Sequence, residues 1–262
     1  MKGICRSLAL CLALAGICSC EVESDPGDFT KEETALIRTY SEYADASVSG
    51  SRTGELCMVP PGTMRVLTIK DEADSAVLRD TSRYLSAKAL KSEEYEALTR
   101  LMVATVTHPS QDGVGIAGPQ VGLNRRVVAV QRFDKGTTGP DGQEIYPFEV
   151  YPNIRIVWAS DSLAYGPEGC LSVPDRRGDV LRSQEIVIEY TDMERLLSQD
   201  SRFTARQGRK AKHPSLKGCK GVRHDLCNEG CPTRRDTVRG FTAVIFQHET
   251  DHLDGVLYID RL

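Results

Sequence analysis

Residues 247–255 read QHETDHLDG and place two histidines four positions apart, with a glutamate directly after the first. Residues four apart share one face of a helix, so His248 and His252 can direct ring nitrogens at the same metal ion. Glu249 lies about a hundred degrees round the helix axis, where it can reach a water on the ion without being a ligand. The spacing therefore predicts a metal centre that activates water.

A catalytic metal site usually needs a third protein ligand and an open fourth position. The long zinc-protease motif continues with x-x-Gly-x-x-His, and here Gly255 matches its glycine whereas Tyr258 stands in place of the histidine. A neutral tyrosine is a poor metal ligand. We therefore expect the third ligand upstream of the two histidines.

Two upstream stretches carry suitable side chains. EGCLS, residues 168–172, presents Cys170 in a turn-like segment, and a thiolate there would complete a Cys-His-His site. GVGIAGPQVG, residues 113–122, is a glycine-rich loop in which small residues allow close backbone approach. It contains Gln120, whose side chain both donates and accepts hydrogen bonds.

The three stretches, in this order, resemble the motifs of the peptide deformylase family, which read Gly-x-Gly-x-Ala-x-x-Gln, Glu-Gly-Cys-x-Ser and His-Glu-x-x-His. The resemblance extends over residues 64–262. It implies that Cys170, His248 and His252 bind one divalent metal ion, and that Glu249 serves as general base and acid. Fe²⁺ is the metal that the resemblance implies, and Zn²⁺ and Ni²⁺ are alternatives.

The same resemblance implies roles for the residues around the metal. Gln120 and the backbone N–H of Leu171 would stabilise the oxyanion of the transition state, and the backbone at Val114 and Gly115 would bind the substrate. The implied activity is hydrolytic removal of the formyl group from N-formylmethionyl peptides. Two alternatives stay open, a protein that binds formyl peptides without turnover and another small-acyl amidase. Glu249 favours an enzyme, because a pure binder needs no base.

The elements that must position these residues predict an α+β fold. Ser92 is a good N-cap for a helix over 93–108, and the metal motif lies on a second helix that Gly255 ends. β-Branched content predicts strands at 64–69, 125–131, 153–159 and 185–191. The resemblance to deformylases implies that antiparallel strands pack around a central helix carrying His-Glu-x-x-His.

The length of 262 residues and the hydrophobic content of 40% suit one globular domain with appendages. The net charge of -4 gives no reason to expect nucleic acid as a partner. Residues 1–20 have Lys2 and Arg6 before an apolar stretch, then small residues and Cys20, which predicts an export signal. The end of this stretch resembles a bacterial lipoprotein cleavage site, so we expect an envelope protein anchored to the membrane by lipid on Cys20. Free secretion, or an apolar helix packed on the domain, is the alternative.

Residues 21–63 are expected to form a tether or linker, with a short helical pattern over 30–43. A basic insert at 195–235 interrupts the deformylase-like domain, and a solvated loop is its default reading. Its three cysteines, with Cys57, predict two disulfides if the chain is exported. A second metal site from Cys219, His224, Cys227 and Cys231 is the alternative. Glu168 is expected either to support the metal site or to be exposed.

Overall fold

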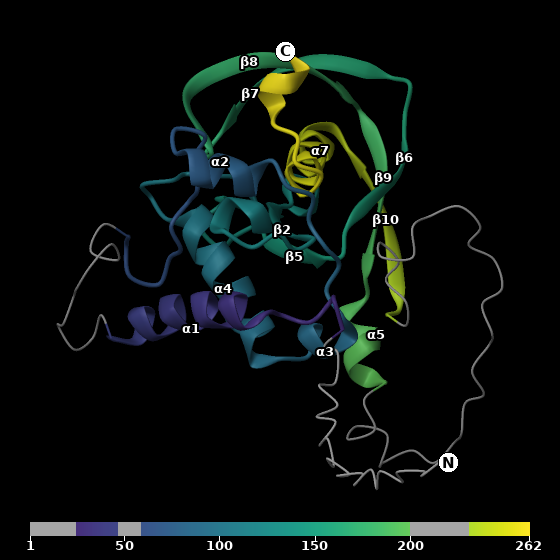
Figure 1. The fold of residues 1–262 in the computed structure, drawn as a ribbon. Helices are drawn as coiled ribbons and strands as arrows, with labels where there is room; N and C mark the ends of the chain where they lie inside the picture. Colours follow the sequence, from purple (N-terminus) through teal and green to yellow (C-terminus); the bar gives the residue numbers. More distant parts are fainter. Residues whose placement is uncertain (1–24, 47–58, 200–230) are drawn as a thin grey trace, which may run out of the picture.

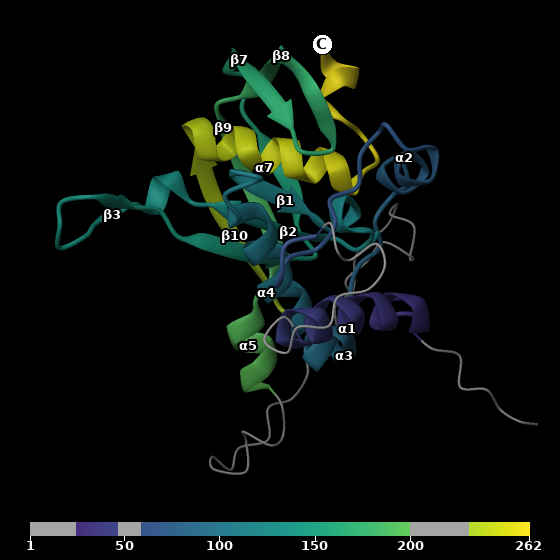
Figure 2. The same ribbon diagram turned by 90° about the vertical axis from the view of Figure 1, so that its left-hand side faces the viewer.

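The structure is a computed structural model that describes residues 25–46, 59–199 and 231–262 (Figure 1). Helix α7 (Gly240–Leu253) runs through the middle of the molecule with antiparallel strands around it. The second view places the β7–β8 hairpin on one side of α7 and strands β1 and β2 on the other (Figure 2). The predicted α+β fold with a central helix carrying the metal motif is confirmed.

Two three-stranded antiparallel sheets flank the central helix. The first has the order β1 (Gly115–Ala117), β2 (Val127–Gln131), β5 (Phe148–Pro152), and the second the order β10 (Thr233–Arg239), β9 (Glu185–Thr191), β6 (Arg155–Ala159). The predicted strands at 125–131, 153–159 and 185–191 appear as β2, β6 and β9. Val127–Val130 of β2 and Ile186 and Ile188 of β9 are fully buried, whereas β6 is only partly buried.

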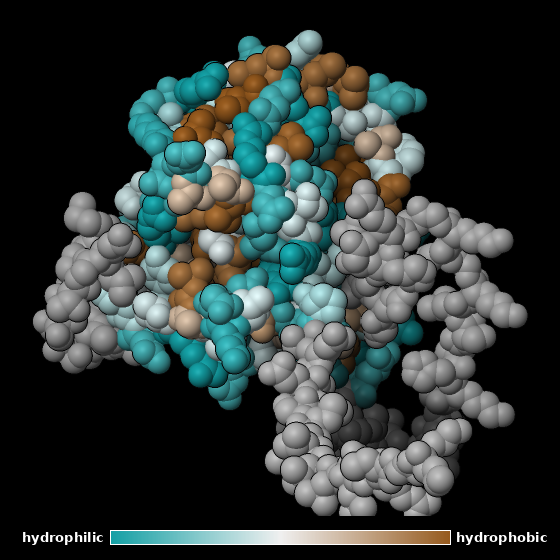
Figure 3. Space-filling view, in the orientation of Figure 1, coloured by the Kyte–Doolittle hydropathy of each residue, from teal (hydrophilic) through white to brown (hydrophobic). Residues whose placement is uncertain are grey.

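Two hairpins complete the strands. β7 (Leu163–Cys170) pairs with β8 (Val173–Ser183) and arches over α7, while β3 (Thr137–Thr138) and β4 (Glu144–Ile145) form an outlying arm. Leu163 and Leu181 on the β7–β8 hairpin are 52% and 41% exposed. Brown apolar groups accordingly lie among polar ones at the top of Figure 3, where this hairpin and the C-terminus are found.

The remaining helices lie below the first sheet in both ribbon views, except the helix at 72–78, which lies higher, about level with α7. They are α1 (Lys31–Ala46), α2 (Glu72–Leu78), α3 (Ala87–Leu90), α4 (Glu93–Thr107) and α5 (Met193–Ser198), with 3₁₀ turns η2 (Gly118–Val121), η3 (Phe133–Lys135) and η5 (Tyr258–Arg261). The Ser92 hydroxyl caps α4 by accepting from the N–H of Tyr95 at 3.2 Å, as predicted. Gly255, with φ of +72°, follows the end of α7.

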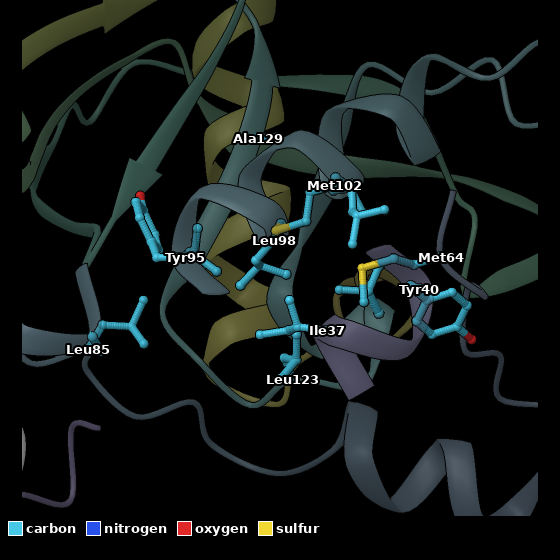
Figure 4. Packing of buried hydrophobic residues seen from close by; sticks show 14 of the residues in the cluster. Ile37, Tyr40, Met64, Leu85, Tyr95, Leu98, Met102, Leu123 and Ala129 are labelled. Atoms are coloured by element: carbon cyan, nitrogen blue, oxygen red, sulfur yellow. The ribbon is translucent and has the colours of Figure 1, made fainter. Parts of the chain in front are cut away.

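Helix α1 belongs to the hydrophobic core. Ile37 and Tyr40 are 1% and 8% exposed and pack with Leu98, Met102 and Leu123 (Figure 4). The prediction that residues 21–63 are a tether is therefore wrong for residues 25–46. The sequence pattern indicated a helix there, but an amphipathic helix gains stability only when its apolar stripe is buried, and here it is.

The predicted strand at 64–69 is also wrong. The segment is extended but pairs with no neighbouring strand in the described chain. Instead the N–H of Leu67 donates to the carbonyl of Gln120 at 2.8 Å, and the N–H of Ile69 donates to the carbonyl of Ser172 at 3.0 Å. Two further N–H groups of the segment donate to side chains, that of Met64 to Oγ1 of Thr105 and that of Thr68 to Oδ2 of Asp74, so its hydrogen bonds go to four separate places rather than to one strand.

Several predictions concern residues outside the described part. The predicted export signal at 1–20, with lipid on Cys20, is one of them. The others are most of the insert at 195–235, with Cys219, His224 and Cys227, and the predicted disulfide cysteine Cys57. Cys231 is described and has no disulfide partner among the described residues. Across residues 25–46, 59–199 and 231–262, no helix is both long enough and apolar enough to cross a membrane.

Candidate metal centre

Three of the predicted site residues form a cluster with metal-ligand geometry. The ligand atoms of Cys170, His248 and His252 all lie within 4.8 Å of one another. The Sγ of Cys170 is 3.1 Å from Nε2 of His252. Ligand atoms on a tetrahedral ion of zinc size, with bonds of about 2.3 Å to sulfur and 2.0 Å to nitrogen, stand about 3.5 Å apart. The cluster therefore fits one divalent ion.

The two elements that carry the ligands explain the convergence. One turn of α7 separates His248 from His252, and their rings stand 5.1 Å apart between centroids. Cys170 is the last residue of β7, where the register of the β7–β8 hairpin shifts between Gly169 and Cys170. This irregularity turns Cys170 toward the helix that the hairpin covers.

Glu168 supports the site and is 7% exposed. Its Oε2 lies 2.8 Å from Nδ1 of His248, which leaves Nε2 of that ring for the metal. Arg182 donates to both carboxylate oxygens of Glu168, at 2.7 and 3.0 Å. Burial alone would raise the pKa of Glu168, but hydrogen bonds from His248 and Arg182 lower it to about 2.

Sequence reasoning missed the charged chain behind Glu168. Arg182, 4% exposed, also donates to Asp251 at 2.6 Å, and Asp251 accepts from Arg261 at 2.5 and 2.6 Å. A buried guanidinium needs such partners, because an unpaired buried charge is costly. Nothing in the spacing of these residues links β8 to the metal helix. The position of Asp251 directly before His252 on the predicted helix was the one sign in the sequence that this carboxyl lies near the cluster.

The two histidines differ in their proton affinity when no metal is present. Burial pushes the pKa of His252 well below its usual range, so its ring is neutral and ready to be a ligand. Burial would also lower the pKa of His248, but hydrogen bonds with Cys170 and Glu168 raise it to about 10. A metal ion must therefore displace a proton from His248 at neutral pH.

Glu249 lies beside the cluster without being part of it. The residue is 4% exposed, and its Oε2 has no hydrogen-bond partner among the described residues. Burial raises the pKa of this carboxyl to about 7. Such a value suits a group that takes and returns a proton near neutral pH. A buried carboxylate with a free oxygen at this place fits the predicted base.

Gln120 directs an amide donor at the cluster. Its Oε1 accepts from the N–H of Ala117 at 2.8 Å. This hydrogen bond fixes the orientation of the amide group, so Nε2 points away from Ala117. Nε2 lies 3.2 Å from the hydroxyl of Ser172 and 3.6 Å from Sγ of Cys170. The side chain, 1% exposed, is thus fixed with its N–H₂ toward the metal ligands.

Strand β1 forms the edge of its sheet next to the cluster. The N–H of Ala117 points to Gln120 and away from β2, and hydrogen-bond direction alternates along a strand. Gly115, two residues earlier, therefore presents its N–H and C=O outward at this edge. The carbonyl of Val114 is occupied by the N–H of Gln131 at 2.8 Å. Of the two predicted substrate-binding residues, Gly115 has the freer backbone.

The cluster opens into a cavity of about 750 Å³. Val114, Gly115 and Leu171 line it together with an apolar wall from α7, and its mouth carries Asp112, Arg176 and Arg177. The wall consists of Phe241, Val244 and Ile245. The structure thus brings every predicted site residue to one cavity, because Gln120, Cys170, His248 and Glu249 line it too and His252 joins the cluster.

Comparison with known proteins gives a consistent result. A family model described as polypeptide deformylase matches residues 64–210 and 222–262. A peptide deformylase of Leptospira biflexa is 31% identical over 186 residues, which is 71% of this chain and 82% of that protein. Peptide deformylase 2 of a Nostoc species is 37% identical over 161 residues, covering 62% of this chain and 68% of that protein.

A solved structure shares the fold. The class I type b peptide deformylase from Acinetobacter baumannii, with Met-Ala-Ser bound, aligns with a TM-score of 0.53 and 27% identity over 76% of this chain and 98% of that one. The family match covers well over half of this chain and includes all three motifs around the metal cluster. On the fold, the cluster and these matches together, the chain belongs to the peptide deformylase family of hydrolases.

Proposed function

We propose that this protein removes the formyl group from the N-terminus of N-formylmethionyl peptides in a metal-dependent reaction. One observation carries the proposal: a Cys-His-His ligand set lies beside Glu249, a buried carboxylate with a free oxygen. A protein that only binds formyl peptides has no use for an unpartnered buried carboxylate, whose burial is costly.

The chain's own residues supply the proton transfer and the charge stabilisation. Cys170, His248 and His252 would hold a divalent ion, which would lower the pKa of a bound water from about 15.7 toward 7. Glu249 takes the proton of the attacking water and delivers it to the nitrogen of the leaving amine. The Nε2–H₂ of Gln120 donates to the oxygen that becomes negative as the formyl carbon turns tetrahedral.

The shape of the cavity supports a formyl group at the cleaved end. Gly115 lies so close to Glu249 and Ile245 that even a Cβ on Gly115 would collide with them. A wall this tight has room for the smallest acyl group and disfavours longer ones. The apolar wall of Phe241, Val244 and Ile245 suits the methionine side chain that follows. Outward backbone groups of Gly115 can pair with the peptide as an added strand.

The metal that we propose is Fe²⁺, with Zn²⁺ and Ni²⁺ as the competing outcomes. Thiolate and imidazole donors accept all three ions, so the donor set alone does not select one. Elemental analysis of protein purified without oxygen, followed by activity after replacement with each metal, distinguishes them. Full activity with Zn²⁺ only would overturn the assignment of Fe²⁺.

We also propose that the protein is exported and anchored through lipid on Cys20. The support is the sequence of residues 1–20, with basic residues, an apolar stretch and a cysteine after small residues. Two hydrogen bonds tie the start of the described chain to the domain: Nη1 of Arg125 donates to the carbonyl of Pro26 at 3.0 Å, and the N–H of Ser86 donates to the carbonyl of Gly27 at 2.9 Å. Five residues from Cys20 to Asp25 reach roughly 17 Å at most, so the domain would lie close to the bilayer. Mass spectrometry of the N-terminal peptide and loss of membrane association in Cys20→Ser test this.

The experiment that tests the proposed activity is turnover of formyl-Met-Ala-Ser by the purified protein, with metal measured on the same sample. Acetyl-Met-Ala-Ser is the matched control, because it differs only by a methyl group at the acyl carbon. We expect deformylation with little or no deacetylation. Binding of the formyl peptide without turnover, in protein that holds one metal ion per chain, would favour a binding protein instead.

A further inference from the structure

The segment 25–46 lies outside the residues matched by the family model, yet it packs against the turn that carries Gln120. We propose that this segment is a strap that positions Gln120, and that Glu33 and Arg125 are positioning residues for the reaction. The inference rests on the proposed function, because it uses the role of Gln120 at the oxyanion.

Arg125 locks the strap to the domain. Its side chain is 2% exposed, and its Nε and Nη2 donate to the two carboxylate oxygens of Glu33, both at 2.7 Å. The same guanidinium donates to the carbonyl of Pro26 at 3.0 Å and to that of Asp28 at 2.5 Å. A buried guanidinium is stable only with its hydrogen-bonding capacity satisfied, so Arg125 requires the strap in this place.

The backbone of Arg125 is directly joined to the Gln120 turn. Its N–H donates to the carbonyl of Leu123 at 2.7 Å, and the N–H of Leu123 donates to the carbonyl of Gly118 at 3.0 Å. A Cβ on Gly118 would lie 2.7 Å from the carbonyl oxygen of Leu123, so the two ends of the turn are in close contact. Gln120 lies between them. A displacement of Arg125 is therefore passed to the turn, which has no room to absorb it.

Apolar side chains of α1 cover the outer side of the same turn. Ile37 and Leu123 are 1% and 0% exposed and lie side by side in Figure 4. Cδ2 of Leu36 would contact a Cβ on Gly122 at 3.4 Å, and Gly122 ends η2 with φ of +84°. The turn is thus packed between α1 on one side and the metal ligands on the other, where Nε2 of Gln120 faces Cys170.

The consequence for catalysis follows from the position of this donor. Removal of a single oxyanion donor typically costs about 10²- to 10³-fold in kcat, so a partial displacement costs less. In the native protein the N–H of Thr30 donates to Oε2 of Glu33 at 2.8 Å. Glu33→Gln keeps a side-chain oxygen that can accept this bond, but it removes the negative charge that pairs with Arg125. We expect kcat to fall about 3- to 10-fold, with metal content and KM unchanged.

The test is a double-mutant cycle in the full chain, with Glu33→Gln made alone and together with Gln120→Ala. If the strap acts through Gln120, adding Glu33→Gln to the Gln120→Ala variant should change kcat by less than about twofold. Arg38→Gln is the matched control on the same helix, because Arg38 is 65% exposed and pairs with Glu94 on α4 at 2.7 Å. This control should leave kcat unchanged in both backgrounds.

A second variant and a second readout keep the test decisive. Leu36→Ala should lower kcat by less than Glu33→Gln does, and this loss should also disappear in the Gln120→Ala background. Leu36→Ala replaces Glu33→Gln in the cycle if that variant fails to fold. Hydrogen exchange of the peptide over 118–125 should become faster in both variants, whether or not the protein has turnover. Equal losses of kcat with and without Gln120, or unchanged exchange over 118–125, would overturn the strap. Absence of deformylation in the wild type would overturn the proposed function and leave the exchange result to decide the strap.

Discussion

Gly115→Ala is expected to disable the enzyme without removing its metal. The Cβ of an alanine there would lie 2.9 Å from Cδ of Glu249 and 2.9 Å from Cγ2 of Ile245, and closest of all to the Glu249 carboxylate oxygen. Ordinary contact begins at 3.4 Å, so the carboxylate must move. A displacement of roughly 0.5–1 Å of a catalytic group lowers turnover by up to about 10²-fold.

The assay is kcat for formyl-Met-Ala-Ser, measured with metal content and melting temperature on the same preparation. Gly166→Ala is the matched control, because a Cβ on Gly166 meets no atom within 4 Å. We expect the control to be as active as the wild type and Gly115→Ala to fall by about 10- to 100-fold with one metal ion per chain. Turnover within twofold of the wild type in Gly115→Ala would refute the claim that this glycine makes room for Glu249. Loss of the metal would mean that the methyl group disturbs the ligands instead.

Three further predictions concern the same centre. Glu249→Gln should keep one metal ion per chain and lose about 10²- to 10⁴-fold in kcat, and elemental analysis with a rate at saturating peptide checks both. Cys170→Ala should abolish stoichiometric metal, and a full complement in that variant would contradict the ligand assignment. The pKa of Glu168 is about 2 in the folded, metal-free protein, below its unfolded value, so its stabilisation is present above pH about 4.5 and is lost as the pH falls toward 2. Glu168→Gln should lower the free energy of unfolding of the metal-free protein at pH 7 by an amount on the order of 3 kcal/mol. This difference should narrow below pH 4.5, as thermal unfolding at several pH values measures.

The sequence predicted the elements whose pattern is local and regular. β2, β6 and β9 carry runs of β-branched residues, and α4 and α7 carry apolar residues at helical spacing between clear start and stop signals. It also predicted that Cys170, His248 and His252 lie together, because each belongs to a motif of several fixed positions. The close approach of Gly115 to Glu249 and Ile245 could not be predicted from the sequence, because it depends on how β1 packs against α7.

What the sequence did not predict depends on contacts between distant segments. The β7–β8 hairpin has charged residues such as Arg176, Arg177 and Asp179 along an exposed face, so it lacks the apolar run that marks a buried strand. The pattern over 30–43 indicated a helix but not its docking site, which Arg125 and Leu123 provide from another part of the chain. Arg182 carried no signal at all, because its partners come from β7 and α7.

Charge balance in the centre explains why these distant residues belong together. Four acidic groups surround the proposed metal position: the thiol of Cys170, which binds a metal as a thiolate, and the carboxyls of Glu168, Glu249 and Asp251. Two positive groups, Arg182 and Arg261, contact Glu168 and Asp251 only. Two negative charges remain, and a divalent ion neutralises them.

The pKa shifts of two neighbouring groups follow from the same charges. Without the ion, hydrogen bonds with Cys170 and Glu168 outweigh burial and raise the pKa of His248 to about 10, while burial raises that of Glu249 to about 7. Both shifts disfavour negative charge beside the ligands, because an unbalanced charge in a buried site is costly. Arg182 and Arg261 offset the charges of Glu168 and Asp251, and a divalent ion on the three proposed ligands would favour the ionised form of Glu249 that the proposed base requires.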